Sequence, residues 1–296
     1  MEKTNKNILA IDVGGSTIKY AISNPNGELF NKNNFPTPNS LEKLYEEFEK
    51  IFNSNKPLQG IALSMPGSVD TKNGIITGSS ALKYIHNKTI KKDLETKLKT
   101  KISMENDANC AALAEIWKGE AKDVEDCCLV VCGTGIGGAI VKNRKIHHGK
   151  NLHGGEFGYL ILGLDEKNEP IMWSFNSTVN VVEKVAKELG KNSKDLNGKE
   201  IFDNVDKNPV YKKYVDMFYK YMAIGIYNIQ YVFDPEIIII GGAISKRNDL
   251  VENVYKYVDE YIKKLQVPKI RPIIKVCKFG NDSNLIGAVY HFLNSN

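Results

Sequence analysis

Two glycine-containing turns and one acidic stretch in this sequence have residue types that bind phosphate and move protons. The first turn follows an apolar strand. It contains Asp12, Gly14, Gly15, Ser16, Thr17 and Lys19. Backbone amides and hydroxyl groups in such a turn can bind a phosphate, and the aspartate can hold a hydrated Mg²⁺. A simple hairpin turn is the alternative, but this order of residues after an apolar strand favours phosphate binding.

A second glycine-rich turn lies about one domain further along the chain. It begins with Gly133, Thr134 and Gly135 and continues to Gly138. The stretch matches the dinucleotide-binding pattern G-x-G-x-x-G, but such a site needs a helix directly after the glycines. Residues 139–142 are instead a short β-branched run followed by turn residues. We therefore expect a strand-turn-strand loop that binds the β and γ phosphates of a nucleotide.

An acidic stretch between the two turns offers a general base. Asp107 stands at the start of an alanine-rich helix, next to Asn106, whose carboxamide can bind a hydroxyl group. An aspartate at this place can also act only as an N-cap or as a first-turn acid favoured by the helix dipole. Because predicted phosphate turns flank it in the sequence, we expect Asp107 to accept the proton of an alcohol during phosphoryl transfer.

Strands and helices that would position these residues alternate along the chain. Apolar patterns predict strands at residues 8–11, 18–22, 28–35, 60–63, 102–104, 127–131, 139–141, 237–240 and 273–276. Helical spacing predicts helices at residues 41–52, 88–99, 179–189, 211–233 and 250–265, besides the one that Asp107 begins. The second half repeats the strand-strand-strand-helix order of the first. This indicates an internal duplication and an α/β fold with mixed sheets.

Length and composition predict a globular protein of two domains. The 296 residues exceed the size at which one core usually stops growing, so we expect a cleft between two domains that can hold a small molecule. We expect the first domain at residues 1–116, completed by a helix at 283–296, and the second at 117–282. The net charge of +5 comes from scattered lysines, and the basic stretch 88–101 lacks the interleaved aromatic residues of a nucleic-acid surface.

The sequence also predicts a cytoplasmic protein with reduced cysteines. Residues 1–6 hold no apolar signal core, and the longest nearly apolar run, residues 237–244, is far shorter than the ~20 residues that cross a bilayer. Three of the five cysteines fall within or directly after one predicted strand, and no C-x-x-C spacing occurs. Such cysteines are typical of a reduced core rather than of a metal site.

Five stretches carry motifs in a fixed order over nearly the whole chain, at residues 11–19, 64–67, 105–110, 133–138 and 154–159. Together they resemble the ROK family of bacterial sugar kinases and repressors, within the actin/hexokinase/Hsp70 ATPase superfamily. The resemblance implies two ribonuclease-H-like domains of the actin-like ATPase kind. It further implies ATP and Mg²⁺ as cofactors, a hexose-type sugar phosphorylated at its 6-hydroxyl, and a homodimer.

The same resemblance implies roles for individual residues. ATP would be held by the first turn, by the second turn and by an adenosine motif at Gly241 and Gly242, with Asp12 near the Mg²⁺. The sugar would be held by Gly67, Asn106, Asp107 and Glu156, with Asp107 as the base.

Departures from the family pattern bear on the metal and on the substrate. Tyr159 stands where most members have a histidine, and no cysteine occurs between Cys132 and Cys277, so we expect no structural zinc. This variant resembles the zinc-less branch that includes β-glucoside kinases, and some N-acetylmannosamine kinases are similar. A further sugar-binding glutamate of the family has no acidic match near residues 173–178.

Five residues near this region receive no catalytic role. His147, His148 and His153 precede the Glu156 loop, but surface histidines beside a turn are commoner than functional ones. Trp173 and Phe175 could line a sugar pocket, although packing into the protein explains an aromatic residue there at least as well.

Two other functions are consistent with parts of the sequence. ROK repressors resemble these kinases preceded by a winged helix-turn-helix, for which we expect no room because the first phosphate strand begins by Asn7. An ATPase of the actin or Hsp70 kind would share the nucleotide turns without a sugar site. The sugar kinase is preferred, with ATP and a small-molecule sugar as ligands and neither nucleic acid nor a membrane as a partner.

Overall fold

The computed structural model describes residues 6–295, which fold into two compact units. The first unit comprises the chain up to Lys122, His148–His153 and the residues from Asn281 onward; the second comprises Asp123–His147 and Gly154–Gly280. Residues 1–5, on which the predicted lack of a signal core largely depends, lie outside the described range. No helix within residues 6–295 is both long and apolar enough to cross a membrane.

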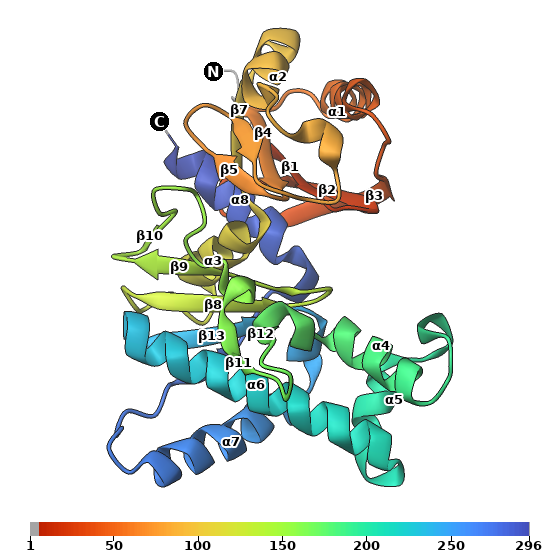
Figure 1. Cartoon of the computed structure of the whole chain (residues 1–296). Coiled ribbons are helices and arrows are strands. Elements are labelled where there is room, and N and C mark those ends of the chain that lie inside the picture. Colours follow the sequence, from red (N-terminus) through yellow and green to blue (C-terminus); the bar gives the residue numbers. More distant parts are fainter. Residues whose placement is uncertain (1–5, 296) are drawn as a thin grey trace. The chain divides into compact units, whose positions relative to one another are not determined.

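The first unit is built on a five-stranded sheet in the order β3-β2-β1-β4-β7 (Figure 1). Its strands are β1 (Ile8–Val13), β2 (Thr17–Ser23), β3 (Leu29–Pro36), β4 (Gly60–Met65) and β7 (Lys101–Asn106). β1, β2 and β3 pair antiparallel, whereas β1, β4 and β7 run parallel. β1 and β4 are buried along their whole length, which explains why their sequences are almost continuously apolar.

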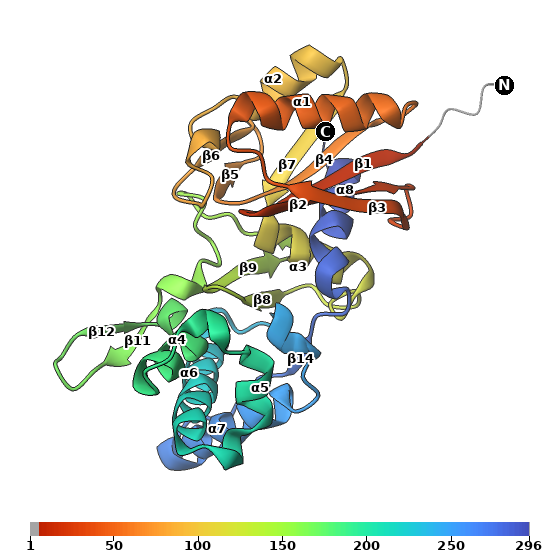
Figure 2. The ribbon, with the colours of Figure 1, turned by 90° about the vertical axis from the view of Figure 1, so that its right-hand side faces the viewer.

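Helices cover both faces of this first sheet (Figure 2). They are α1 (Leu41–Ser54), α2 (Ile90–Leu98), α3 (Asp107–Lys118) and α8 (Ser283–Asn294). Ile11 packs in the core under α1 and α2, while its neighbour Ala10 packs in the core under α3 and α8, as the alternation along a strand requires. α1 begins where the Ser40 side chain accepts a hydrogen bond from the backbone N–H of Lys43.

Helix α8 connects the end of the chain to the strands at its beginning. Leu285, Val289 and Phe292 share a core with Ile8 of β1. α8 approaches α3 so closely that a β-carbon on Gly287 would be 1.7 Å from the backbone oxygen of Cys110. Only glycine permits this approach, so α8 is an integral layer of the first unit.

The second unit repeats the strand order of the first, with the sheet β10-β9-β8-β13-β14. Its strands are β8 (Cys127–Cys132), β9 (Ile136–Lys142), β10 (Lys145–Ile146), β13 (Ile237–Gly241) and β14 (Ile274–Val276). β8, β9 and β10 pair antiparallel, and β8, β13 and β14 run parallel. The repeated topology agrees with the expected duplication and with an α/β fold of mixed sheets.

The helices of the second unit pack against one another and against its sheet in a single core. They are α4 (Thr178–Glu188), α5 (Gly198–Asp203), α6 (Pro209–Phe233) and α7 (Leu250–Leu265). Trp173 is fully buried in this core, and a β-carbon on Gly225 of α6 would be 2.3 Å from its ring. Trp173 therefore packs into the protein, whereas Phe175 is exposed.

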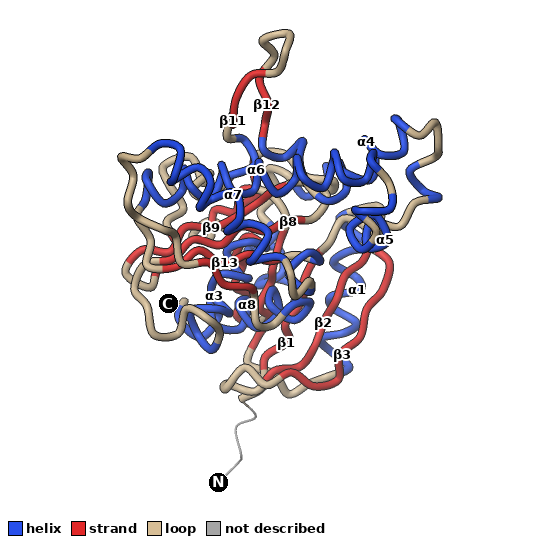
Figure 3. The backbone as a smooth tube through the Cα atoms, turned by 90° about the horizontal axis from the view of Figure 1, so that it is seen from below, coloured by secondary structure: helices blue, strands red, loops and turns tan. Residues whose placement is uncertain are grey.

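Two small hairpins complete the strands. β5 (Ser68–Asp70) and β6 (Ile75–Thr77) follow β4, and β11 (Ile161–Leu164) and β12 (Pro170–Met172) form a hairpin that projects from the second unit (Figure 3). Short 3₁₀ helices lie at Lys83–Ile85, Phe157–Tyr159, Trp173–Asn176, Ser193–Asp195, Val205–Lys207, Ala243–Lys246 and Gly280–Asp282. All five cysteines are free thiols, and four of them are buried.

Candidate active site

The parallel strands of the first unit end with polar side chains in one row. Asp12 of β1 pairs in register with Ser64 of β4, and Ser64 pairs with Glu105 of β7. Residues in register on neighbouring strands point to the same face of a sheet. Ligands of α/β proteins bind at the carboxyl ends of parallel strands, so this row is the candidate site of the first unit.

Asp12 is fixed by protein donors on one of its oxygens. Its Oδ1 accepts hydrogen bonds from Ser64 Oγ at 2.8 Å and from Asn284 Nδ2 at 3.0 Å, and its Oδ2 lies 4.0 Å from Lys19 Nζ. A single oriented carboxylate fits a hydrated Mg²⁺, which is usually bound through one or two carboxylates, several waters and phosphate oxygens. Among the described residues, no three histidine, cysteine, aspartate or glutamate side chains form a metal-binding group.

The predicted first phosphate turn joins β1 to β2 and is tightly constrained. The Gly14 N–H donates to the Thr17 oxygen at 3.1 Å, and Thr37 Oγ1 donates to the Gly14 oxygen at 2.7 Å. A β-carbon on Gly14 would be 2.6 Å from the Thr17 oxygen, so the turn requires glycine there. The connection is thus a hairpin in shape, and phosphate binding by it stays a prediction.

The junction of β7 and α3 gives Asn106 and Asp107 defined positions. Asn106 is the N-cap of α3, because its Oδ1 accepts from the Asn109 N–H at 3.1 Å. Its Nδ2 donates to the Gly67 oxygen and to Asp107 Oδ1, both at 3.0 Å. Asp107 Oδ1 also accepts from the Ala108 N–H at 2.8 Å. The structure therefore brings together three of the four predicted sugar-binding residues.

Glu156 belongs to the second unit, whereas Gly67, Asn106 and Asp107 belong to the first. It precedes the 3₁₀ helix that begins at Phe157. Gly155 before it has a positive φ of 87°, and a β-carbon there would be 2.6 Å from the Ala139 backbone. The Glu156 loop thus lies directly against β9, while Tyr159 is largely exposed.

His148, to which the sequence assigned no role, contacts the acidic stretch. Its Nε2 lies 2.8 Å from Glu105 Oε2, although 43 residues separate the two. The hydrogen bond to Glu105 raises the pKa of His148 above its ordinary value, against the lowering effect of burial. The sequence alone does not distinguish His148 from His147 and His153. Only the fold shows that His148 contacts Glu105, whereas the other two histidines are exposed.

The second predicted phosphate turn links β8 to β9 and is shorter than expected, because the predicted strand already begins at Ile136 and includes Gly137 and Gly138. Residues at the start of α4 hold its carbonyl groups: Ser177 Oγ donates to the Thr134 oxygen at 2.7 Å, and Thr178 Oγ1 to the Gly133 oxygen at 3.3 Å. A β-carbon on Gly133 would meet nothing within 4 Å. The turn is therefore supported from one side and open at its first glycine.

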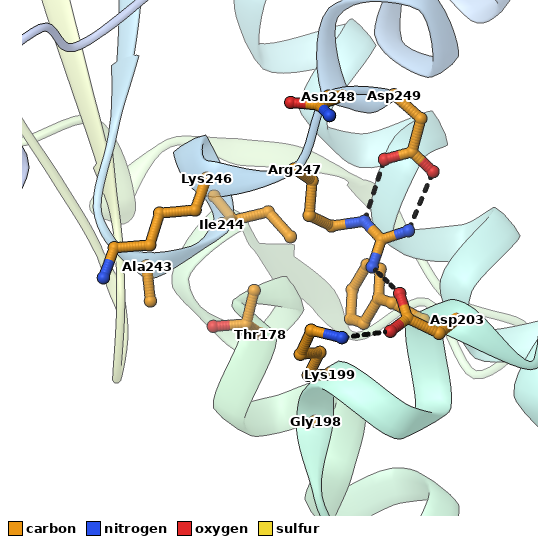
Figure 4. Close-up of a pocket in the computed structure, with 11 residues that line it drawn as sticks. Thr178, Gly198, Lys199, Asp203, Ala243, Ile244, Lys246, Arg247, Asn248 and Asp249 are labelled. Carbon is orange, nitrogen blue, oxygen red and sulfur yellow. Dashed lines mark hydrogen bonds and ion pairs between the residues drawn. The ribbon is translucent and has the colours of Figure 1, made fainter.

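The predicted adenosine motif lies at the carboxyl end of β13, beside a pocket of about 630 Å³ (Figure 4). Gly242 has a positive φ of 89°, and a β-carbon there would be 2.0 Å from the Cys132 oxygen. Glycine therefore lets the chain turn closely past β8. Ala243 and Ile244 follow it along the pocket, and Thr178 lines another wall.

Arg247 connects several walls of this pocket (Figure 4). Its Nε and Nη2 donate to the two oxygens of Asp249 at 2.9 and 2.8 Å, and its Nη1 donates to Asp203 Oδ1 at 2.6 Å. The guanidinium carbon lies 5.5 Å from the centre of the Phe202 ring. These bonds fix the end of α5 to the residue before α7. This contact could not be predicted from local sequence patterns, because 44 residues separate Arg247 from Asp203.

Comparison with known proteins identifies the relatives of this chain. The ROK family pattern matches residues 8–294. A β-glucoside kinase of Listeria innocua is 33% identical over 292 residues, covering 97% of each protein. A crystal structure of a ROK family protein from Streptococcus pneumoniae in complex with sucrose is 34% identical, with a TM-score of 0.89 over 97% of this chain and 98% of that one. A Listeria monocytogenes structure, provisionally described as an N-acetylmannosamine kinase, is 32% identical, with a TM-score of 0.87 over 97% of this chain and 98% of that one. The resemblance and the actin-like fold class predicted from the sequence are thereby confirmed, and the chain belongs to the ROK family.

Proposed function

We propose that this protein is an ATP-dependent sugar kinase that phosphorylates a hexose-type sugar at its 6-hydroxyl. The observation that carries the proposal is the position of Asp107. It is partly exposed at the start of α3 and is oriented by Asn106 and Ala108, and Asn106 also binds Gly67. The kinase names of the relatives support an alcohol acceptor. β-Glucosides, glucose and N-acetylmannosamine are the candidate sugars.

The pocket of the second unit fits the nucleoside part of ATP. Its volume of about 630 Å³ is in the range of small-molecule sites. Thr178 lines the pocket and also donates a hydrogen bond to Gly133, so the pocket adjoins the second phosphate turn. In our proposal the base and ribose lie beside Gly242, and the phosphates extend toward Gly133.

Asp107 would act as the general base. It accepts the proton of the sugar hydroxyl while that oxygen forms a bond to the γ-phosphorus and the bond to the ADP oxygen breaks. The hydrogen bonds from Asn106 and Ala108 restrict the rotation of its carboxylate before the sugar binds. Asn106 and Gly67 would hold neighbouring hydroxyl groups, with Glu156 as a further sugar ligand. Mg²⁺, held through water by Asp12, would neutralise phosphate charge when bound.

The repressor alternative is not favoured, because relatives that are 31–33% identical over 95–97% of each protein are named β-glucoside kinases. An ATPase of the actin or Hsp70 kind is not favoured either, because the same relatives are named kinases of a sugar derivative. A homodimer and a cytoplasmic location stay predictions from the sequence, as does the lack of a structural zinc.

Coupled detection of ADP release tests the proposal. The purified protein is assayed with ATP and Mg²⁺ against glucose, cellobiose, gentiobiose, N-acetylmannosamine and N-acetylglucosamine. We expect one or more sugars to raise ADP release far above the rate without sugar. An equal rate with and without every sugar would favour the ATPase and contradict the kinase.

Replacing Arg247 with lysine should raise the KM for ATP roughly 10-fold, because lysine cannot bind Asp249 with two parallel bonds and reach Asp203 as well. The KM for the sugar should change little. Steady-state kinetics with each substrate varied in turn measures the difference.

Arg271→Lys is the matched control for that variant. Arg271 also binds one aspartate through two nitrogens, Asp259 at 2.7 and 3.0 Å, but it is exposed and does not line the pocket. Its replacement should leave the KM for ATP unchanged. Equal values for both variants would mean that Arg247 does not shape the nucleotide site.

A further inference from the structure

The segment His148–His153 belongs to the first unit, although the residues on both sides of it belong to the second. Its first residue makes the contact with Glu105. The Glu105 side chain is 1% exposed and that of His148 is 31% exposed. A carboxylate buried to this degree costs free energy unless its charge is paired and its oxygens are hydrogen-bonded.

Glu105 uses its second oxygen to bind the start of α3. Oε1 accepts hydrogen bonds from the Asn106 N–H at 2.7 Å and from Asn109 Nδ2 at 2.9 Å. Asn106 in turn donates to Asp107 and to Gly67. A continuous path of hydrogen bonds therefore runs from the His148 ring through Glu105 to the residues proposed to bind and deprotonate the sugar.

The charges around His148 favour its protonated form. Glu105 of β7 and Asp70 of β5 both raise the pKa of His148. His291 of α8 also interacts with His148, and burial lowers the pKa of His291 although Glu105 acts to raise it. His291 therefore releases its proton at a lower pH than His148.

We propose that His148, as an imidazolium, is a positioning residue of the sugar site that fixes Glu105 and through it Asn106 and Asp107. The inference rests on the proposed function, in which Asn106 binds the sugar and Asp107 accepts the proton of its hydroxyl group. When His148 loses its proton, the Glu105 carboxylate loses the positive charge beside its Oε2, and its position then depends mainly on the hydrogen bonds from Asn106 and Asn109 to Oε1. The first turn of α3 then loses part of its support.

The sign of the pH effect follows from the raised pKa of His148. The ion pair of His148 with Glu105 is fully formed at pH values below the ordinary histidine pKa of ~6.5. It is lost as the pH rises through the raised pKa of His148 in the folded protein. We therefore expect kcat/KM for the sugar to fall on the alkaline side of the wild-type pH profile. The KM for ATP should show no such change.

His148→Gln tests the proposal, because glutamine keeps a donor but cannot carry the charge. We expect kcat/KM for the sugar to fall roughly 10-fold to 100-fold, by analogy with the loss of a hydrogen-bond partner of a metal-binding residue. The variant should lack the alkaline decline and stay near the level that the wild type reaches at high pH. His147→Gln is the matched control, since His147 is the exposed neighbour of His148.

Two results would overturn the inference. One is a His148→Gln variant with the same kinetics and pH profile as His147→Gln, measured with a sugar that the wild type phosphorylates. The other comes from NMR titration of the wild-type ring and needs no variant to fold: a His148 pKa at or below the ordinary value would mean that no imidazolium is held there. A wild type inactive on every sugar would instead reject the proposed function, so the two failures are distinguishable.

Discussion

Replacing Asp107 with asparagine should lower the turnover of sugar phosphorylation roughly 10²-fold to 10⁴-fold, the usual contribution of a general base. The protein should stay folded, because the asparagine oxygen can still accept the hydrogen bond from the Ala108 N–H. The amide cannot take the proton of the sugar hydroxyl. Measuring kcat by ADP release and the thermal unfolding midpoint on the same sample separates the two effects.

Asp93→Asn provides the matched control for that experiment. Asp93 lies in the first turn of α2, where it accepts hydrogen bonds from Thr89 and Tyr45. Like Asp107, it interacts favourably with a helix dipole, a contribution of about 0.3–1 kcal/mol to stability. The Asp93 variant should keep wild-type turnover. If the Asp107 variant loses no more turnover than this control, Asp107 is only a helix-terminal acid.

The second large effect is expected for Asp12→Asn, which should lower turnover about 10²-fold at a fixed Mg²⁺ concentration. Asparagine can keep the acceptor oxygen that Ser64 and Asn284 use, so the change removes charge and little else. A weaker hold on the hydrated metal should also raise the Mg²⁺ concentration needed for half-maximal activity. A Mg²⁺ titration of initial rates gives both values.

Ser64→Ala separates the charge of Asp12 from its orientation. This variant keeps the carboxylate and removes one of its two donors, which costs about 1 kcal/mol for a typical hydrogen bond. Its Mg²⁺ dependence should stay close to that of the wild type. A Mg²⁺ response that is unchanged in Asp12→Asn would contradict the metal role of this carboxylate.

The long elements could be predicted from the sequence because their apolar patterns are local. The run at residues 8–11 predicts the buried strand β1, and the pattern at 211–233 predicts α6, which begins two residues earlier with Pro209 after the Asn208 cap. The β-branched residues after Gly138 correctly predict a strand where the glycine pattern suggests a helix. In each case neighbours in the sequence determine the structure.

Features that depend on distant contacts could not be predicted in this way. β5 and β6 have three residues each, too few for a periodic signal. The pairing of His148 with Glu105 and the contact of Arg247 with Asp203 exist only because the fold brings separate elements together. The glycine motifs and Asp107 could be identified from the sequence, because each motif consists of consecutive residues.

The position of α8 has a consequence for the order in which the nascent chain can complete its cores. A ribosome makes residues 281–295 only after the whole of the second unit has been synthesised. Until then, Ile8 and its neighbours lack Leu285, Val289 and Phe292, the side chains that fill one face of their sheet. Although domains often fold in the order of their synthesis, the half that emerges first from the exit tunnel is here the last to become fully packed.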